Sequence, residues 1–237
     1  MNVITLASRK GGAGKSTLTA QLAAQAHASG KRVTVIDADP QGSLSLWHSL
    51  RKDGLPKLVT PERGLDRALA FAMIEGADTV FIDTAPTMWV VVQEAIRVAT
   101  LVLIPARPGF FDVAAVRETV KVARERDRPY AVVINAAPVK RDEKEASLVA
   151  ASRAYFETLQ IPVWSGQISQ RAGFQSTLAA GASAAEIGPA TAAGVEIAKL
   201  WSAVERSVEA INNARFEPGV AANESGVMGA GAGERAA

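Results

Sequence analysis

Residues 10–17 read Lys10-Gly11-Gly12-Ala13-Gly14-Lys15-Ser16-Thr17, and they come directly after the apolar run Val3-Ile4-Thr5-Leu6-Ala7. The apolar run is short and rich in β-branched residues, which predicts a buried strand. Glycines allow successive backbone N–H groups to turn inward around an anion, and the helix expected after the loop points its positive end at the same anion. The stretch therefore predicts a phosphate-binding loop between a strand and a helix.

The side chains of this loop suit a nucleotide and Mg²⁺. Lys15 can reach the β- and γ-phosphates, the Ser16 hydroxyl can bind Mg²⁺, and Thr17 can reach the α-phosphate. The common pattern G-x-x-x-x-G-K-[ST] has a glycine where this chain has Arg9. Lys10 comes too early to share a phosphate with Lys15 without crowding it. It could cross a dimer interface and neutralise the nucleotide of a partner subunit, or it could be a solvated residue at a strand end.

Two further apolar runs end in aspartates. Residues 33–41 read Val-Thr-Val-Ile-Asp-Ala-Asp-Pro-Gln, and alternation along a strand puts Asp37 and Asp39 on one side of the strand end. Residues 79–83 read Thr-Val-Phe-Ile-Asp, so that Asp83 is placed to hold Mg²⁺ through water. A single aspartate at a strand end is more often a cap or turn residue. The phosphate-binding loop followed by these two motifs, in this order, predicts a site for Mg²⁺ and a nucleotide.

These three motifs resemble those of the deviant Walker ATPases of the ParA family, and the resemblance covers about residues 1–212. In that family, the lysine that matches Lys10 contacts the nucleotide of the other subunit in an ATP-sandwich dimer. The resemblance implies that Asp39 orients the attacking water and that Asp37 and Asp83 serve the Mg²⁺ shell with Ser16. The implied catalytic residues are Lys10, Lys15 and Asp39.

The nucleotide base needs contacts of its own. Pro105 and Arg107 follow one apolar run, and Asn135 follows the next run, Val132-Val133-Ile134. In the family, the asparagine and the proline-containing loop lie around adenine, and an amide can both donate and accept along a purine edge. Asn135 could instead be an ordinary turn residue after a strand.

The resemblance implies a slow, partner-stimulated ATPase. Binding of ATP and Mg²⁺ would drive a homodimer that binds DNA nonspecifically, and a ParB-like or centromere-binding adaptor would stimulate hydrolysis during plasmid or chromosome segregation. Two alternatives remain open from the sequence. One is ParA-like positioning of a non-DNA cargo, such as a protein cluster or microcompartment. The other is a MinD- or MipZ-like regulator of the division site that acts through protein contacts.

Two groups of basic residues are candidates for DNA contact. Arg117, Lys121 and Arg124 share one face of the helix predicted at 112–127, although nearby acidic residues are equally consistent with an ordinary solvated face. Arg171 ends the stretch Ile-Ser-Gln-Arg, which resembles a short Ile-x-x-Arg stretch of ParA proteins. Contacts of either kind would be with phosphates and would be sensitive to salt.

Apolar runs alternate with helical patterns along the chain. We expect strands at about 2–8, 32–37, 79–83, 100–105, 130–135 and 161–165. We expect helices at about 15–29, 43–52, 64–75, 89–98, 112–127, 143–159 and 189–212, with residues 51–61 as a polar surface excursion. This alternation predicts an α/β fold with a single doubly wound, mostly parallel sheet flanked by helices. The nucleotide should lie at the carboxyl ends of the strands.

Composition agrees with one domain of this class. The chain has 237 residues, of which 48% are hydrophobic and 21% charged, enough for one ATPase domain over residues 1–216. Residues 217–237 are rich in Gly and Ala and have few large apolar side chains, so we expect them to be disordered.

The chain has no cysteines, which argues against relatives that need cysteine ligands, such as the nitrogenase iron protein. The absence is compatible with a reducing compartment. The chain enters its first strand at once, which predicts no N-terminal signal, and no apolar run is long enough to span a bilayer. We therefore expect a cytoplasmic, nucleoid-associated protein without a membrane anchor.

Overall fold

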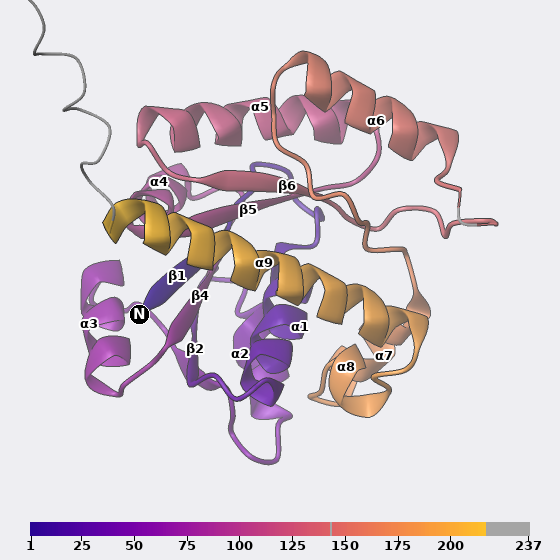
Figure 1. Cartoon of the computed structure of the whole chain (residues 1–237). Coiled ribbons are helices and arrows are strands. Elements are labelled where there is room, and N and C mark those ends of the chain that lie inside the picture. Colours follow the sequence, from indigo (N-terminus) through magenta and orange to yellow (C-terminus); the bar gives the residue numbers. More distant parts are fainter. Residues whose placement is uncertain (143, 217–237) are drawn as a thin grey trace, which may run out of the picture.

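The computed structural model of the chain describes residues 1–142 and 144–216, and within them a six-stranded parallel sheet forms the centre (Figure 1). The strand order is β3-β2-β4-β1-β5-β6. The strands are β1 (Asn2–Leu6), β2 (Val33–Ala38), β3 (Lys57–Val59), β4 (Thr79–Thr84), β5 (Leu101–Ala106) and β6 (Tyr130–Ile134). The predicted fold class is thus confirmed, with the strand that precedes the phosphate-binding loop in the interior of the sheet.

Helices connect the strands and cover both faces of the sheet. They are α1 (Lys15–Ala28), α2 (Ser43–Ser49), α3 (Leu65–Ile74), α4 (Trp89–Val98), α5 (Phe110–Glu125), α6 (Ser147–Thr158), α7 (Ala172–Ala179), α8 (Ala184–Ile187) and α9 (Ala192–Phe216). In the described part of the chain, no helix combines the length and the apolar character that crossing a membrane would require.

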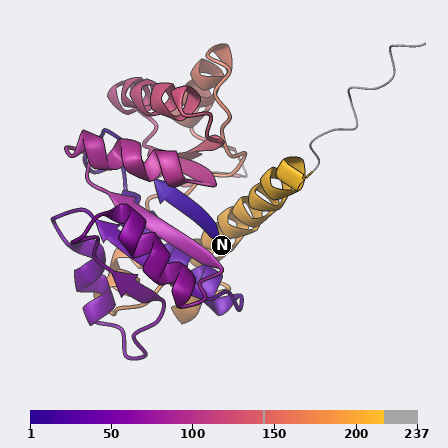
Figure 2. The ribbon, with the colours of Figure 1, turned by 90° about the vertical axis from the view of Figure 1, so that its left-hand side faces the viewer.

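The interior strands are buried on both faces because their side chains alternate between two helical layers. In β5, Leu101 and Leu103 pack into the core beneath α1 and α9, whereas Val102 and Ile104 pack into the core beneath α4, α5 and α6. Continuous apolar runs are the expected pattern for parallel strands covered on both faces. Figure 2 shows α9 passing along the flank of the sheet, where Asn212 donates to Asn2 at the start of β1 (3.0 Å).

The observed elements differ from the predicted ones in three places. No strand forms at 161–165, where only Val163 makes a single bridge to Val132. The excursion at 51–61 contains the edge strand β3, which pairs with β2. Helices α7 and α8 lie in a segment for which no element was predicted, because its short stretches of Ala, Gly and Ser carry little apolar periodicity. The tail predicted to be disordered, residues 217–237, lies outside the described residues.

The core beneath α6 offers a test of the fold. Phe156 is fully buried there, whereas its neighbour Tyr155 is 38% exposed. We expect Phe156→Ala to lower the free energy of unfolding by about 3–5 kcal/mol, because the deletion leaves a cavity beneath α6. Urea denaturation followed by circular dichroism measures the loss. Tyr155→Ala is the control, and equal losses for the two variants would contradict the packing described here.

Candidate nucleotide and magnesium site

The loop of residues 10–14 adopts a conformation that only glycine favours at two positions. Gly12 and Gly14 have φ values of +73° and +94°, and α1 starts immediately afterwards at Lys15. A Cβ on Gly14 would lie 2.1 Å from Nδ2 of Asn135, so this glycine is required by space as well as by backbone angle. The buried Asn135 amide donates to the carbonyl of Ala13 (2.7 Å) and holds the loop against the end of β6.

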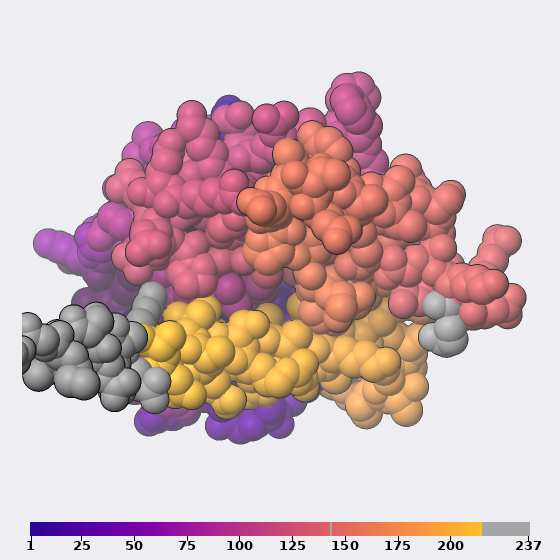
Figure 3. Space-filling model, turned by 45° about the horizontal axis from the view of Figure 1, so that its top comes forward, coloured from indigo at the N-terminus to yellow at the C-terminus, as the bar shows by residue number. Residues whose placement is uncertain are grey.

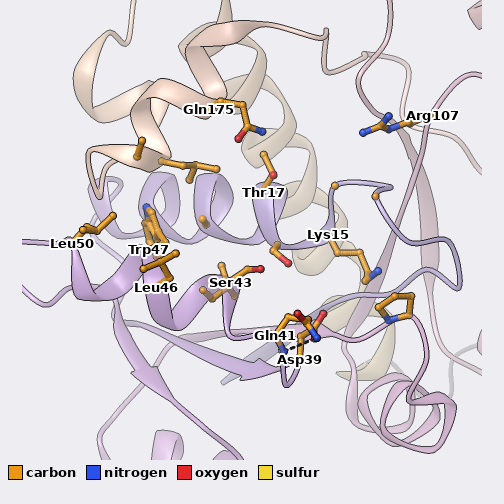
Figure 4. A pocket seen from close by; sticks show the side chains of 18 residues that line it. Lys15, Thr17, Asp39, Gln41, Ser43, Leu46, Trp47, Leu50, Arg107 and Gln175 are labelled. Carbon is orange, nitrogen blue, oxygen red and sulfur yellow. Dashed lines mark hydrogen bonds between the residues drawn. The ribbon is translucent and has the colours of Figure 1, made fainter.

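A cleft of about 630 Å³ opens beside this loop (Figure 4). Lys15 and Arg107 lie at one end of it, with Thr17 and Gln175 further along. The opposite end is apolar and is formed by side chains of α2, α7 and the residue that follows α2, namely Leu46, Trp47, Leu50, Leu178 and Ala179. The cleft therefore has a charged end beside the phosphate-binding loop and an apolar end between two helices.

Lys15 is the cation at the charged end. Burial lowers the pKa of its ammonium group, and the carboxylates of Asp83 and Asp39 oppose that shift. An ammonium group that is largely removed from water gains much from a bound anion, because little solvent screens the attraction. This position is suited to neutralising a phosphate chain that lies along the loop.

Three carboxylates approach the same end of the cleft from neighbouring strands. Asp37 and Asp83 are paired across β2 and β4, at the carboxyl ends of both strands. Asp37 accepts from the backbone N–H (2.9 Å) and the hydroxyl (2.8 Å) of Ser45. Asp39 lies on the turn after β2 and accepts from the backbone N–H of Gln41 (3.0 Å). Asp37 and Asp39 therefore have partners within the protein.

Asp83 is different, since its side chain is fully buried and neither carboxylate oxygen has a hydrogen-bond partner within residues 1–142 and 144–216. Burial raises its pKa to about 7; the Ser16 hydroxyl is near enough to oppose this shift without reaching hydrogen-bond geometry, and Asp37 adds to it. An unpartnered carboxylate beside a serine hydroxyl is a fitting donor set for Mg²⁺, which binds through one or two carboxylates and a phosphate. The described residues contain no cluster of three or more His, Cys, Asp or Glu that could hold a metal ion.

The residues predicted to contact the base are not all brought together. Arg107 lines the cleft, but Pro105 lies within the buried strand β5. Asn135 contacts the back of the phosphate-binding loop instead of the cleft wall. Lys10 flanks the loop, where its backbone N–H donates to the Ser8 hydroxyl (3.3 Å). Gln41 ends the second motif, but the sequence analysis gave it no role. Ser43, Gln175 and the apolar wall of the cleft were not predicted, because none of the three motifs contains them.

The basic residues proposed for DNA contact differ in how they are held. Arg117 and Lys121 are exposed on α5, the helix in the rose-coloured part of the face that Figure 3 shows, and Lys121 lies 3.9 Å from Glu125. Arg124 binds the Tyr130 hydroxyl (2.7 Å) and carbonyls that follow α6. Arg171 forms an ion pair with Glu196 of α9 (2.8 Å).

The buried carboxylate predicts a pH-dependent effect of Asp83→Asn on the nucleotide-free protein. A folded pKa of about 7 lies above the unfolded value, so ionised Asp83 destabilises the native state above pH 7 and ceases to do so as the pH falls towards 4. We expect the variant to be more stable than the wild type by up to about 4 kcal/mol at pH 8, and the difference to shrink towards pH 4. Guanidinium denaturation at several pH values measures it. A difference that is independent of pH would show that Asp83 is not the titrating group.

Comparison with known proteins identifies the family. The model of the CobQ/CobB/MinD/ParA nucleotide binding domain matches residues 4–184. Over 132 residues the chain is 32% identical to protein ParA of Rhizobium radiobacter, which covers 54% of this chain and 58% of that protein. Over 190 residues it is 25% identical to the maintenance of carboxysome distribution protein A of Halothiobacillus neapolitanus, which covers 78% and 87%. The aligned region thus spans only somewhat over half of the length of the ParA relative.

Solved structures show the same fold at lower identity. The septum site-determining protein MinD of Pyrococcus horikoshii, complexed with Mg-ADP, aligns with a TM-score of 0.68 at 15% identity, over 89% of this chain and 98% of that chain. The glycines of the phosphate-binding loop, the cleft and the carboxylates all lie within the residues that the family model matches, as do the three motifs. The chain therefore belongs to the CobQ/CobB/MinD/ParA family of nucleotide-binding domains.

Proposed function

We propose that the protein is a Mg²⁺-dependent ATPase that positions a cargo. The observation that carries this proposal is that buried Lys15 lines the charged end of the cleft and interacts electrostatically with the buried, unpartnered carboxylate of Asp83. A phosphate chain and a divalent ion would satisfy both buried charges at once. Membership of a nucleotide-binding family supports ATP as the ligand.

Each residue at this end has a role in the proposal. The backbone N–H groups of residues 11–14 and the Lys15 ammonium bind the phosphates, and Thr17 binds the α-phosphate. Ser16, Asp37 and Asp83 hold Mg²⁺, which would neutralise charge that develops on the phosphate oxygens. Asp39 orients the attacking water from the turn after β2. These groups act by positioning and by charge, as phosphoryl transfer requires.

The three residues predicted to contact the nucleotide base have different positions relative to the cleft. Arg107 lines the cleft and can contact the nucleotide itself. Asn135 supports the site from behind, because its amide fixes the Ala13 carbonyl of the phosphate-binding loop. Pro105 lies within the buried strand β5, one residue before its end, and Arg107 follows the strand directly.

We assign to Lys10 a role between subunits. Its side chain is not part of the wall of its own cleft, although it lies at the start of the phosphate-binding loop. In a face-to-face homodimer it would neutralise the nucleotide of the partner subunit, so that dimer formation and charge compensation become one event. Hydrolysis, slow alone and stimulated by an adaptor protein, would then release the dimer.

The cargo distinguishes two versions of this function. In the first, the ATP-bound dimer binds DNA nonspecifically on the nucleoid, and a ParB-like or centromere-binding adaptor couples it to a plasmid or chromosome; the likeness to protein ParA supports this version. In the second, the cargo is a protein assembly, and the likeness to a carboxysome distribution protein over 78% of the chain supports it. A division-site regulator of the MinD kind would use the same site with protein partners.

The two lysines of the loop should have separable roles. Lys15→Ala should abolish ATP binding, because the phosphates lose their main countercharge, whereas Lys10→Ala should bind ATP normally and fail to dimerise. Calorimetry measures binding, and light scattering with and without ATP measures dimer formation. Undiminished ATP affinity of Lys15→Ala would refute the assignment of the loop. An ATP-dependent dimer of Lys10→Ala would place Lys10 within its own subunit.

Asp39→Ala should keep ATP and Mg²⁺ binding and lose turnover, because a carboxylate that orients water matters mainly in the transition state. The variant should therefore accumulate as a stable ATP-bound dimer. Phosphate release at saturating ATP measures turnover, and calorimetry measures binding in parallel. Hydrolysis near the wild-type rate would mean that another group orients the water.

DNA binding should depend on the exposed face of α5. Replacing Arg117 and Lys121 by Ala should weaken duplex binding equally on unrelated sequences and lower the slope of log affinity against log salt by about one unit for each lost contact. Fluorescence anisotropy with ATP measures this, and Arg171→Ala is the comparison. If only Arg171→Ala weakens binding, the surface lies around residues 168–171. If the wild type binds no DNA with ATP, the protein-cargo version is favoured.

A further inference from the structure

Helix α2 forms one wall of the cleft and follows the turn that carries Asp39. At its start, Ser45 donates to Asp37 through both its backbone N–H and its hydroxyl. The turn itself is tied to the helix, since the N–H of Gly42 donates to the carbonyl of Asp39 (2.9 Å) and the N–H of Leu46 donates to that of Gly42 (2.9 Å). The direction of α2 and the position of Asp39 are therefore coupled through the backbone.

The other end of α2 is held by an ion pair between a buried arginine and a partly exposed glutamate. Arg51, two residues beyond the helix, has a side chain that is only 4% exposed. Its guanidinium binds Glu186 of α8 through two nitrogens (2.7 and 3.2 Å) and the carbonyl of Gly181 (3.1 Å). It also lies over the Trp47 ring, 4.9 Å from the ring centre, and its Nε is 3.4 Å from Asp53. A guanidinium bound in two places has a defined orientation.

The segment that receives Arg51, residues 172–187, is itself firmly held. Gly181 has a φ of +68°, and a Cβ there would lie 2.4 Å from the carbonyl oxygen of Leu50, so that the chain passes against the end of α2. The Trp47 indole N–H donates to the carbonyl of Ala182 (3.2 Å). On its other side, the segment is bound to α1, where the fully buried Gln21 accepts from the N–H of Ala184 (2.7 Å).

Glu186 holds the end of α2 and the start of α8 at the same time. It forms a capping box with Ser183, whose N–H donates to the Glu186 carboxylate (2.8 Å). Burying such a pair contributes little net stability, because desolvation offsets the attraction, but it defines geometry strongly. The contact joins residues that are 135 positions apart in the sequence, across the apolar end of the cleft.

We propose that Arg51 and Glu186 are positioning residues for ATP hydrolysis, which fix α2 from its far end and so place Asp39 for the attacking water. The proposal rests on the function proposed above for Asp39. The phosphate-binding loop belongs to β1 and α1, and neither of these elements contributes a residue to this ion pair. Loss of the pair should therefore lower kcat much more than it lowers the affinity for ATP.

The test compares Arg51→Gln, Glu186→Gln and Arg51→Lys with a matched control. Arg153→Gln removes a similar clamp on α6, where Arg153 binds Glu145 through two nitrogens (2.9 and 3.0 Å) and the carbonyl of Gly166 (2.6 Å). That clamp shares no element with the cleft. We measure kcat, the Kd for ATP by calorimetry, and hydrogen exchange of peptides that cover residues 39–50, at a temperature where every variant is folded.

We expect Arg51→Gln and Glu186→Gln to lower kcat about 10-fold or more with a Kd within about twofold of the wild type. Exchange of residues 39–50 should become faster in both variants, and Arg51→Lys should restore part of each loss. Arg153→Gln should leave kcat, Kd and this exchange unchanged. If one of the two glutamine variants fails to fold, the other carries the test.

Three results would overturn the proposal. One is unchanged exchange at residues 39–50 in the variants of the ion pair. Another is a kcat equal to that of the wild type, and the third is an equal effect of Arg153→Gln, which would indicate general destabilisation. If the wild type itself hydrolyses no ATP, the proposed function fails, and the exchange measurement alone then decides whether the ion pair fixes α2.

Discussion

The unsatisfied charge of Asp83 is the constraint on which the rest of the site depends. Its carboxylate lies in the interior of the sheet and is fully buried, and none of the residues that the structure describes forms a hydrogen bond with it. Lys15 lies nearby and is also largely withdrawn from water. Burial of these two charged groups costs more free energy in the free protein than in a complex with phosphate and a cation. Ligand binding and native-state stability are thus linked, because the contacts that bind the nucleotide also compensate the buried charges and stabilise the native state.

Much of this arrangement could be predicted from the sequence, because the elements that carry it are long or chemically specific. Apolar runs mark the four interior strands and the edge strand β6. Glycines mark the phosphate-binding loop, and two of them, Gly12 and Gly14, have positive φ in the structure. The pairing of Asp37 with Asp83 follows once the two strands are neighbours. Local pattern was sufficient where one segment determines its own structure.

The sequence was insufficient where segments far apart determine each other. Strand β3 has three residues, one of them a lysine, and exists because it completes the hydrogen bonding of β2. Helices α7 and α8 are short, and their place depends on Gln21 of α1 and on Arg51 beyond α2. Asn135 matched a motif for base contact, yet its amide is used by a carbonyl 122 residues earlier. No spacing of residues in the sequence predicts such long-range contacts.

The contact between Asn135 and Ala13 has a consequence for the order in which the molecule can be assembled during synthesis. The phosphate-binding loop lies near the first residues to leave the ribosome, but the amide that supports it belongs to Asn135, which directly follows β6. A growing chain that ends before β6 has the glycines and Lys15 without the support behind them. The phosphate-binding loop should therefore gain its full support only once the chain has been synthesised past residue 135, just beyond its middle.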